Sequence, residues 1–179
     1  AMVLADLARS QGGCKAIVVA NGIPSLIHLM INGSREAQKH TTCALWSLTS
    51  SGTVGKTTVE QSSKAVIEGG AIPMLVQLAS RVSDSQGYAV ATLDNLGNNG
   101  AARDTMLEED VITALTGLTG GPHSWMKSHA VDLLQVLGVN IENGPAKLNI
   151  EQANGQRGSA QIASARPTMK FQARQFSAR

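Results

Sequence analysis

Aromatic residues are scarce in this chain of 179 residues, where they make up 3% of the sequence. The five aromatic side chains are Trp46, Tyr88, Trp125, Phe171 and Phe176. Hydrophobic residues nevertheless reach 42%, so leucine, isoleucine, valine, alanine and methionine must fill the core. The length and the apolar content are sufficient for one domain of ordinary size. A core of aliphatic side chains favours closely packed helices.

Cysteines and long apolar runs are also nearly absent. Cys14 and Cys43 are the only cysteines, which excludes a disulfide framework and a pair of metal ligands and predicts free thiols in a reducing compartment. No run approaches the roughly 18 apolar residues of a membrane span, and no charged segment followed by an apolar one opens the sequence. We therefore expect no membrane span and a cytoplasmic protein, with the cilium and the cytoskeleton as alternatives.

Charge is distributed unevenly along the chain. Residues 1–138 contain 9 Lys and Arg against 11 Asp and Glu, whereas residues 139–179 contain 6 against 2. A slightly acidic body without a basic stripe argues against a nucleic-acid domain, although the basic tail could contact an acidic surface.

Aliphatic residues recur at fixed intervals, which indicates an internal repeat. Leucines at 4, 45, 93 and 134 are 41, 48 and 41 residues apart, and leucines at 7, 48, 96 and 137 repeat these intervals three residues later. In a second register, Ile23, Ile72 and Ile112 are 49 and 40 residues apart, and leucines three and six residues after each keep that spacing. Such a triplet lies on one stripe of a helix.

Each repeat is predicted to hold a short helix, a second helix with the aliphatic stripe and a longer third helix that ends in the paired leucines. In ANGIPSL (20–26) and GGAIPML (69–75), glycine frees the backbone where one helix ends, and Pro24 or Pro73 lies in the first turn of the next. The predicted divisions are the end of a truncated preceding repeat at 1–10, repeats at 14–50, 62–98 and 101–138, the last of them degenerate, a lengthened connection at 51–61, a degenerate capping helix at 139–155 and a basic extended tail at 156–179.

The segment GTVGKTT (52–58) is similar to a phosphate-binding loop. Such a loop needs glycine, four residues and then Gly-Lys-Ser/Thr after a β-strand, because its backbone N–H groups wrap a phosphate. Here Ser50 stands five residues before Gly55, and a predicted helix precedes the segment. The segment is therefore interpreted as a solvated connection between repeats.

These features resemble the armadillo repeat. IEGGAIPMLVQLAS (67–80) with ATLDNLG (91–97) matches its pattern best, followed by VVANGIPSLIHLM (18–30) with CALWSL (43–48) and then by EEDVITALTGL (108–118) with DLLQVL (132–137). The resemblance covers about residues 1–138. It implies an all-α protein, a right-handed α-solenoid of three-helix repeats whose third helices line a concave groove, and a non-enzymatic module that binds other proteins.

The residues themselves give no sign of an enzyme. The four histidines, at positions 28, 40, 123 and 129, form no cluster of metal ligands with the two cysteines, and no nucleophile with a base can be assigned. The acidic residues 108–110 are interpreted as a solvated helix end. We expect no catalytic residue, no metal, no cofactor and no small-molecule substrate.

The register predicts which residues face the groove. Positions one, five and eight before the final leucine of a third helix share a face. The predicted partner contacts are His40, Cys43, Ser47, Tyr88, Ala91, Asn95, His129 and Asp132, with Trp46 and Trp125 at the rim. The alternative interpretation of His40, Tyr88 and His129 is that each is simply a polar residue that tolerates solvent near the start of a helix. In importin-alpha-like members, an asparagine and a tryptophan four residues earlier clamp a basic peptide, but here Ala91 precedes Asn95 at that spacing.

Residues 156–179 are rich in Gln, Ala, Ser and Arg and lack a core of their own. They predict contacts with a neighbouring protein through Arg166, Lys170, Phe171, Arg174 and Phe176. This reading supports an alternative function, a structural subunit of a large ciliary, cytoskeletal or other assembly held by its ends and its tail. Folding of the tail back along its own solenoid is the remaining alternative.

Overall fold

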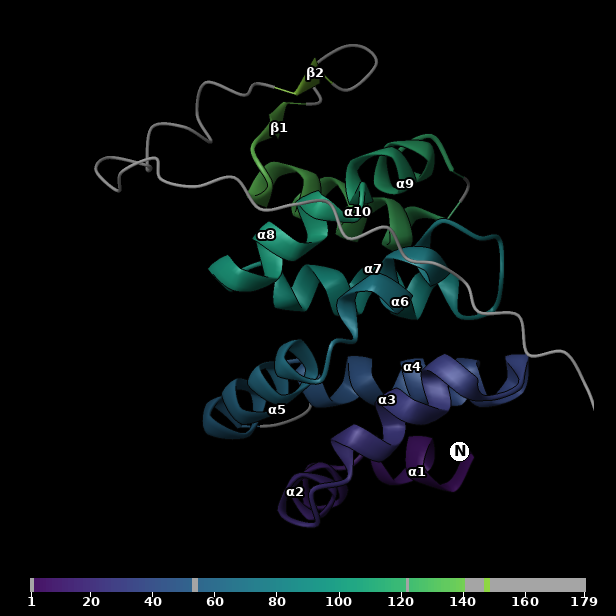
Figure 1. Cartoon of the computed structure of the whole chain (residues 1–179), viewed down its shortest axis with the longest axis vertical. Coiled ribbons are helices and arrows are strands. Elements are labelled where there is room, and N and C mark those ends of the chain that lie inside the picture. The colour runs from purple at the N-terminus through teal and green to yellow at the C-terminus, as the bar shows by residue number, and fades with distance from the viewer. Residues whose placement is uncertain (1, 53–54, 122, 141–146, 149–179) are drawn as a thin grey trace, which may run out of the picture. The chain divides into compact units, whose positions relative to one another are not determined.

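The computed structural model describes residues 2–52, 55–121, 123–140 and 147–148, which belong to a compact unit spanning Ala1–Asn149. The predicted tail lies outside these residues, as do its five predicted contacts. The described part contains ten helices and two short strands (Figure 1). The helices are α1 (Met2–Leu7), α2 (Gln11–Val19), α3 (Ile23–Asn32), α4 (Arg35–Thr49), α5 (Lys56–Glu68), α6 (Ile72–Ala79), α7 (Gln86–Leu96), α8 (Gly100–Glu108), α9 (Val111–Leu118) and α10 (Ser124–Val136), and the strands are β1 (Val139–Asn140) and β2 (Lys147–Leu148).

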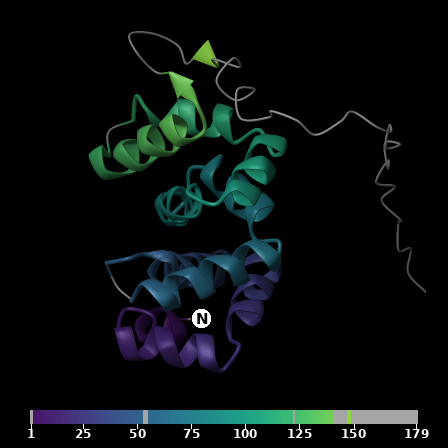
Figure 2. The same cartoon turned by 90° about the vertical axis from the view of Figure 1, so that its left-hand side faces the viewer.

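The helices form three consecutive triplets, α2 to α4, α5 to α7 and α8 to α10, as the sequence predicts. Successive third helices pack against each other, since α4 contacts α7 and α7 contacts α10, while α1 packs on α4 in the position of a further third helix. The triplets follow one another along the unit (Figure 2). This arrangement is an α-solenoid, in which each triplet buries its apolar side chains against its neighbours.

The recurring leucines lie at equivalent places in the third helices. Leu45, Leu93 and Leu134 have no exposed surface, and Leu48, Leu96 and Leu137 are also buried. Their counterparts on α1 are less covered, because Leu4 is half-buried and Leu7 is exposed. The predicted equivalence of these positions is therefore confirmed.

The turns between first and second helices share one backbone feature. Asn21, Gly70 and Asp110 have φ of 52°, 70° and 55°, and they occupy equivalent positions just before α3, α6 and α9. Left-handed backbone is tolerated best by glycine and next by asparagine and aspartate. The sequence prediction assigned this freedom to glycine alone, which is wrong for the first turn, since Gly22 has an ordinary φ of −79°. Asp110 explains how the third repeat turns without a glycine.

The predicted connection at 51–61 is too long. Helix α5 begins at Lys56 and has 13 residues, whereas α2 and α8 have 9 each. Part of the longer interval between repeats is therefore an extra helical turn, residues 56–59, at the start of α5. Helix α5 is also longer than α7, the third helix of the same repeat, which has 11 residues.

The described residues of the predicted capping helix at 139–155 are not helical. Val139–Asn140 pairs with Lys147–Leu148 as a two-stranded antiparallel ladder. Gly138, with φ of 80°, turns the chain after α10, and Val139 is buried in the core. The β-branched Val139 side chain suits a short strand better than a helix.

None of the helices in the described ranges is by itself long and apolar enough to cross a membrane. Helices α2 and α3 meet the length and composition criteria only as a pair, and they are bent by 92° at the break between them.

Candidate functional site on the third helices

The predicted contact residues lie on α4, α7 and α10 and divide into two groups by exposure. Cys43, Ser47 and Ala91 are buried, with exposed fractions of 5%, 3% and 0%. The Ser47 hydroxyl donates to the Cys43 carbonyl oxygen at 3.1 Å. These three small side chains lie where successive third helices approach each other, so they form part of the packing and offer no surface to a partner.

The other predicted residues reach the surface. Trp125 and Asp132 are exposed, and His40, Trp46, Tyr88, Asn95 and His129 are half-buried. We call the surface formed by these seven residues the third-helix face.

Aromatic contacts run across the third-helix face from one helix to the next. The rings of Trp46 on α4 and Tyr88 on α7 have centroids 5.8 Å apart, tilted by 43°. Trp125 on α10 lies over the backbone of α7, because a Cβ atom at Gly87 would be only 2.6 Å from the Trp125 ring. His129 meets Trp125 edge-on at 5.7 Å. Aromatic side chains thus make contacts at both steps between third helices, from α4 to α7 and from α10 to α7.

Two polar contacts also join the third helices. The Asn95 carboxamide nitrogen donates to the Thr49 hydroxyl at 3.2 Å, which links α7 to α4. His129 Nδ1 lies 2.7 Å from an Asp94 carboxylate oxygen, which links α10 to α7. The sequence reasoning missed Asp94, although a half-buried histidine such as His129 requires a polar partner.

Burial raises the pKa of the Asp94 carboxyl above its ordinary value, and the contact with His129 opposes this shift only in part. The folded protein therefore binds this proton more tightly than the unfolded chain does. Stability from Asp94 is present at low pH and is lost as the pH rises through the raised pKa.

We expect Asp94→Asn to gain stability relative to the wild type as the pH rises from the ordinary pKa of an aspartate, about 4, through the raised pKa of Asp94. Asparagine cannot ionise, so it avoids the cost of a buried carboxylate while keeping an oxygen for His129. Thermal unfolding at several pH values measures the difference in Tm, with the exposed Asp104→Asn as the control. If the advantage in Tm of Asp94→Asn over the wild type became smaller as the pH rises, the raised pKa of Asp94 would be contradicted.

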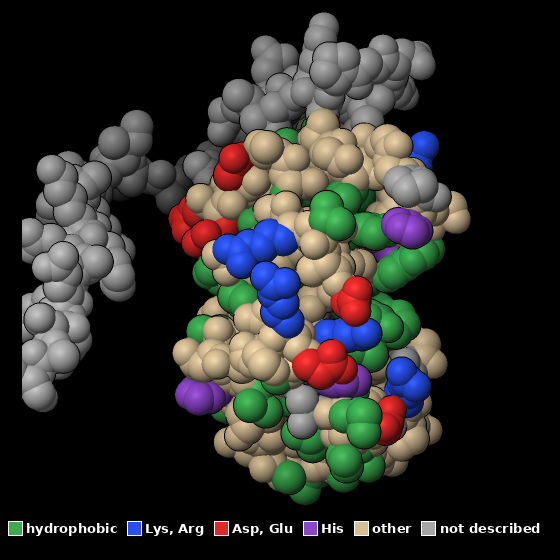
Figure 3. All heavy atoms as spheres, turned by 90° about the vertical axis from the view of Figure 1, so that its right-hand side faces the viewer, with side chains coloured by type: hydrophobic (Ala, Val, Ile, Leu, Met, Phe, Trp, Pro, Cys, Tyr) green, Lys and Arg blue, Asp and Glu red, His purple; other side chains and the backbone are tan. Residues whose placement is uncertain are grey.

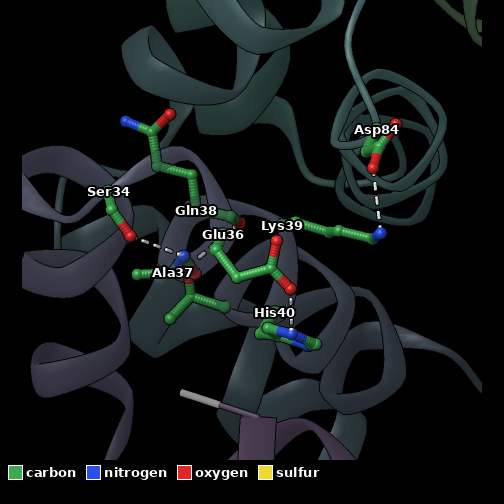
Figure 4. Close-up of polar contacts among 8 residues, drawn as sticks. Ser34, Glu36, Ala37, Gln38, Lys39, His40 and Asp84 are labelled. Atoms are coloured by element: carbon green, nitrogen blue, oxygen red, sulfur yellow. Dashed lines mark hydrogen bonds and ion pairs between the residues drawn. The ribbon is translucent and has the colours of Figure 1, made fainter.

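The start of α4 carries a cluster of charged contacts (Figure 4). The Ser34 side chain accepts a hydrogen bond from the Ala37 backbone at 3.3 Å and caps the helix. His40 Nε2 lies 2.8 Å from Glu36 on the same helix, and Lys39 Nζ donates to Asp84 at 2.9 Å. The hydrogen bond with Asp84 raises the pKa of Lys39. These contacts orient His40 and Lys39, although exposed ion pairs add little stability.

Charges of both signs lie interspersed with hydrophobic side chains on the face shown in Figure 3. Within the described ranges, no three His, Cys, Asp or Glu side chains are grouped as a metal ion would need. Both thiols are free and buried, and the Cys14 Sγ donates to the Ala8 carbonyl oxygen at 2.8 Å. The surface is thus suited to noncovalent contact.

Comparisons with known proteins agree with this fold. A family model described as Armadillo/beta-catenin-like repeat matches residues 10–50. Among solved structures, the designed armadillo repeat protein YIII(Dq)4CqI has a TM-score of 0.62 and 22% identity, over 75% of this chain and 55% of that one. Another designed armadillo repeat protein, YIII(Dq.V1)4CPAF in complex with peptide (KR)4, has a TM-score of 0.58 and 20% identity, over 75% and 54%.

A third solved structure, of computationally designed armadillo repeat proteins for modular peptide recognition, gives a TM-score of 0.64 at 19% identity, over 79% of this chain and 58% of that one. The chain thus spans little more than half the length of these three structures. A comparison with curated proteins finds no match.

The stacked helix triplets and these neighbours define the class, a right-handed α-solenoid. Residues 10–50 match the armadillo repeat model, and the described unit shares its fold with designed armadillo repeat proteins.

Proposed function

We propose that the third-helix face binds an extended segment of a partner protein and that the chain acts as a non-enzymatic interaction module. The observation that carries this proposal is the aromatic surface shared by α4, α7 and α10. Tryptophan, tyrosine and histidine combine a flat apolar body with a polar edge, and such residues supply much of the binding energy at protein interfaces.

The geometry favours an extended ligand over a compact one. Trp46 contacts Tyr88 between α4 and α7, and Trp125 of α10 lies against Gly87 of α7, so one segment can contact several repeats in turn. Standard interfaces bury about 800 Å² per partner, an area that such a row of helices can provide. One designed neighbour is in complex with the peptide (KR)4, and another was designed for modular peptide recognition, which supports a peptide as the ligand class.

The test is selection of peptides from a random dodecapeptide library on the immobilised full chain. Affinities of labelled, synthesised peptides are then measured by fluorescence anisotropy for the wild type and for Tyr88→Ala combined with Trp125→Ala. We expect the double variant to bind about 100-fold more weakly, because it removes two of the large rings that the third-helix face offers to a partner.

The matched control combines Val19→Ala on α2 with Ile31→Ala on α3, which removes two exposed apolar side chains from first and second helices. This control should keep the wild-type affinity. Equal affinity of the wild type and the Tyr88 and Trp125 variant would move the binding site elsewhere.

A second candidate function, that of a structural subunit held by its ends and tail, is favoured by exposed apolar side chains on α1. Met2, Val3 and Leu7 are 60%, 75% and 42% exposed. Deletion of residues 156–179 distinguishes the two candidates, since it should spare a peptide on the third-helix face and abolish assembly through the tail.

A further inference from the structure

A cleft of about 730 Å³ lies between α5 and the turn that follows α7. One side is formed by Lys56, Glu60 and Lys64, which follow one another at intervals of four along α5 and therefore share a helix face. The other side is formed by Asn95, Asn98 and Asn99. The cleft adjoins the third-helix face at Asn95 but contains none of its aromatic residues.

The extra turn of α5 builds this cleft. Residues 60–68 of α5 correspond to residues 100–108, the whole of α8, at the 40-residue interval of the second register. Residues 56–59 therefore have no helical counterpart in α8. Lys56 is on this extra turn, so its place in the cleft has no helical counterpart in the repeat that contains α8.

The charge of the cleft is opposite to that of the chain body. Two lysines face one glutamate in the cleft, whereas acidic residues outnumber basic ones over residues 1–138. Lys64 makes only a loose, exposed contact of 3.8 Å with Glu68, and in the part of the chain that the structure describes Lys56 makes no ion pair. Arg103 adds a third positive charge beside the turn, where it donates to the Gly97 carbonyl oxygen at 3.1 Å.

The asparagines supply hydrogen-bonding groups of both kinds. Asn95 uses its nitrogen to reach Thr49, which leaves its oxygen as an acceptor for a backbone N–H group. Asn99 uses its oxygen to cap α8 at Ala102, which leaves its nitrogen as a donor for a backbone carbonyl. A peptide main chain needs both kinds of partner, whereas a free phosphate needs donors only.

The spacing of the charges defines the sequence that would fit. Lys56 and Lys64 are eight residues apart on one helix, which places them about 12 Å apart along its axis. Residues four apart in an extended peptide are separated by about 13 Å. Glu60 stands midway and repels a carboxylate there, so no acidic residue should lie between the two acids.

We propose that this cleft is a second binding site, which takes an extended segment of a partner protein with two carboxylates four residues apart and no acidic residue between them. The lysines pair with the two carboxylates, and the asparagines contact the main chain. This site does not depend on the proposed role of the third-helix face.

The probe is a fluorescein-labelled octapeptide with glutamates at positions 2 and 6 and glycine or serine elsewhere, measured by anisotropy at low salt with the full chain. Lys56→Glu with Lys64→Glu should weaken binding at least tenfold, because both charge contacts become repulsive. Lys15→Glu with Lys127→Glu makes the same change in net charge away from the cleft and should keep the affinity.

Two further measurements sharpen the test. Glu60→Gln should tighten binding by a few-fold, since it removes the only acid of the cleft. An octapeptide of the same composition with adjacent glutamates should bind several-fold more weakly than the spaced peptide. The reversal at Lys56 places an acid in the first turn of α5, where it favours the helix, so the variant is expected to fold, which circular dichroism verifies.

Three results would overturn the proposal for the cleft. Equal affinity of the double lysine variant for the spaced peptide excludes the cleft as its site. Equal affinity for the two peptides excludes the spacing argument. A third result would assign the cleft to small anions instead of a peptide. In that case tripolyphosphate binds and needs both Lys56 and Lys64, whereas the spaced peptide does not bind. The Tyr88→Ala and Trp125→Ala variant should bind the spaced peptide with the wild-type affinity. The proposal for the cleft and the proposal for the third-helix face can therefore fail independently of each other.

Discussion

Gly13→Ala is expected to destabilise the protein by about 3 kcal/mol or more, because the site has no room for one additional carbon. Gly13 is buried in α2, and a Cβ atom there would overlap the carbonyl oxygen of Leu7 at the end of α1. The obstacle is backbone, so no change of side-chain rotamer relieves it. Urea unfolding followed by circular dichroism measures the loss of stability.

The neighbouring glycine is the matched control. Gly12 lies in the same helix, and a Cβ atom at Gly12 would meet no atom within 4 Å. Gly12→Ala should therefore stabilise the protein by about 0.5 kcal/mol, because alanine loses less backbone entropy in a helix. Equal effects of the two substitutions would show that α1 and α2 do not approach each other as described.

Leu93→Ala should cost about 3 kcal/mol of the free energy of unfolding. Leu93 has no exposed surface, and it lies on α7, which packs against both α4 and α10. The substitution leaves a cavity that these helices can fill only by shifting against each other. Denaturant unfolding measures the change, with a check that the slope of the transition is unchanged.

Leu4→Ala tests the same register at a less covered site. Leu4 is the counterpart of Leu93 on α1 and is only half-buried, so its replacement should cost about 1 kcal/mol. A cost equal to that of Leu93→Ala would mean that burial in the stack does not set the contribution of these leucines.

The repeat architecture was predictable because it depends on spacing alone. Leu45, Leu93 and Leu134 repeat at intervals that the leucines three residues later also keep, and the structure places them on α4, α7 and α10. The helix boundaries were less predictable. Lys56 and Thr57 lie next to glycines in a segment that reads as a connection, yet a helix of 13 residues begins there, since its later residues pack against α2, α3 and α4.

The candidate site could be predicted only in part. The register placed His40, Tyr88 and His129 on the third helices, but it could not tell that Cys43, Ser47 and Ala91 are covered, because coverage depends on how closely the next helix approaches. The contact between Asp94 and His129 spans 35 residues of sequence, and no local pattern identifies such a pair. Whether the third-helix face binds a partner stays a prediction.

The conformation shared by Asn21, Gly70 and Asp110 has a consequence for how such modules diverge. The corner between the first two helices depends on a backbone angle that three residue types accept readily, and the neighbouring glycine and proline are dispensable, as the third module shows. Degenerate repeats in other sequences are therefore better located by a Gly, Asn or Asp at this turn than by a full consensus motif.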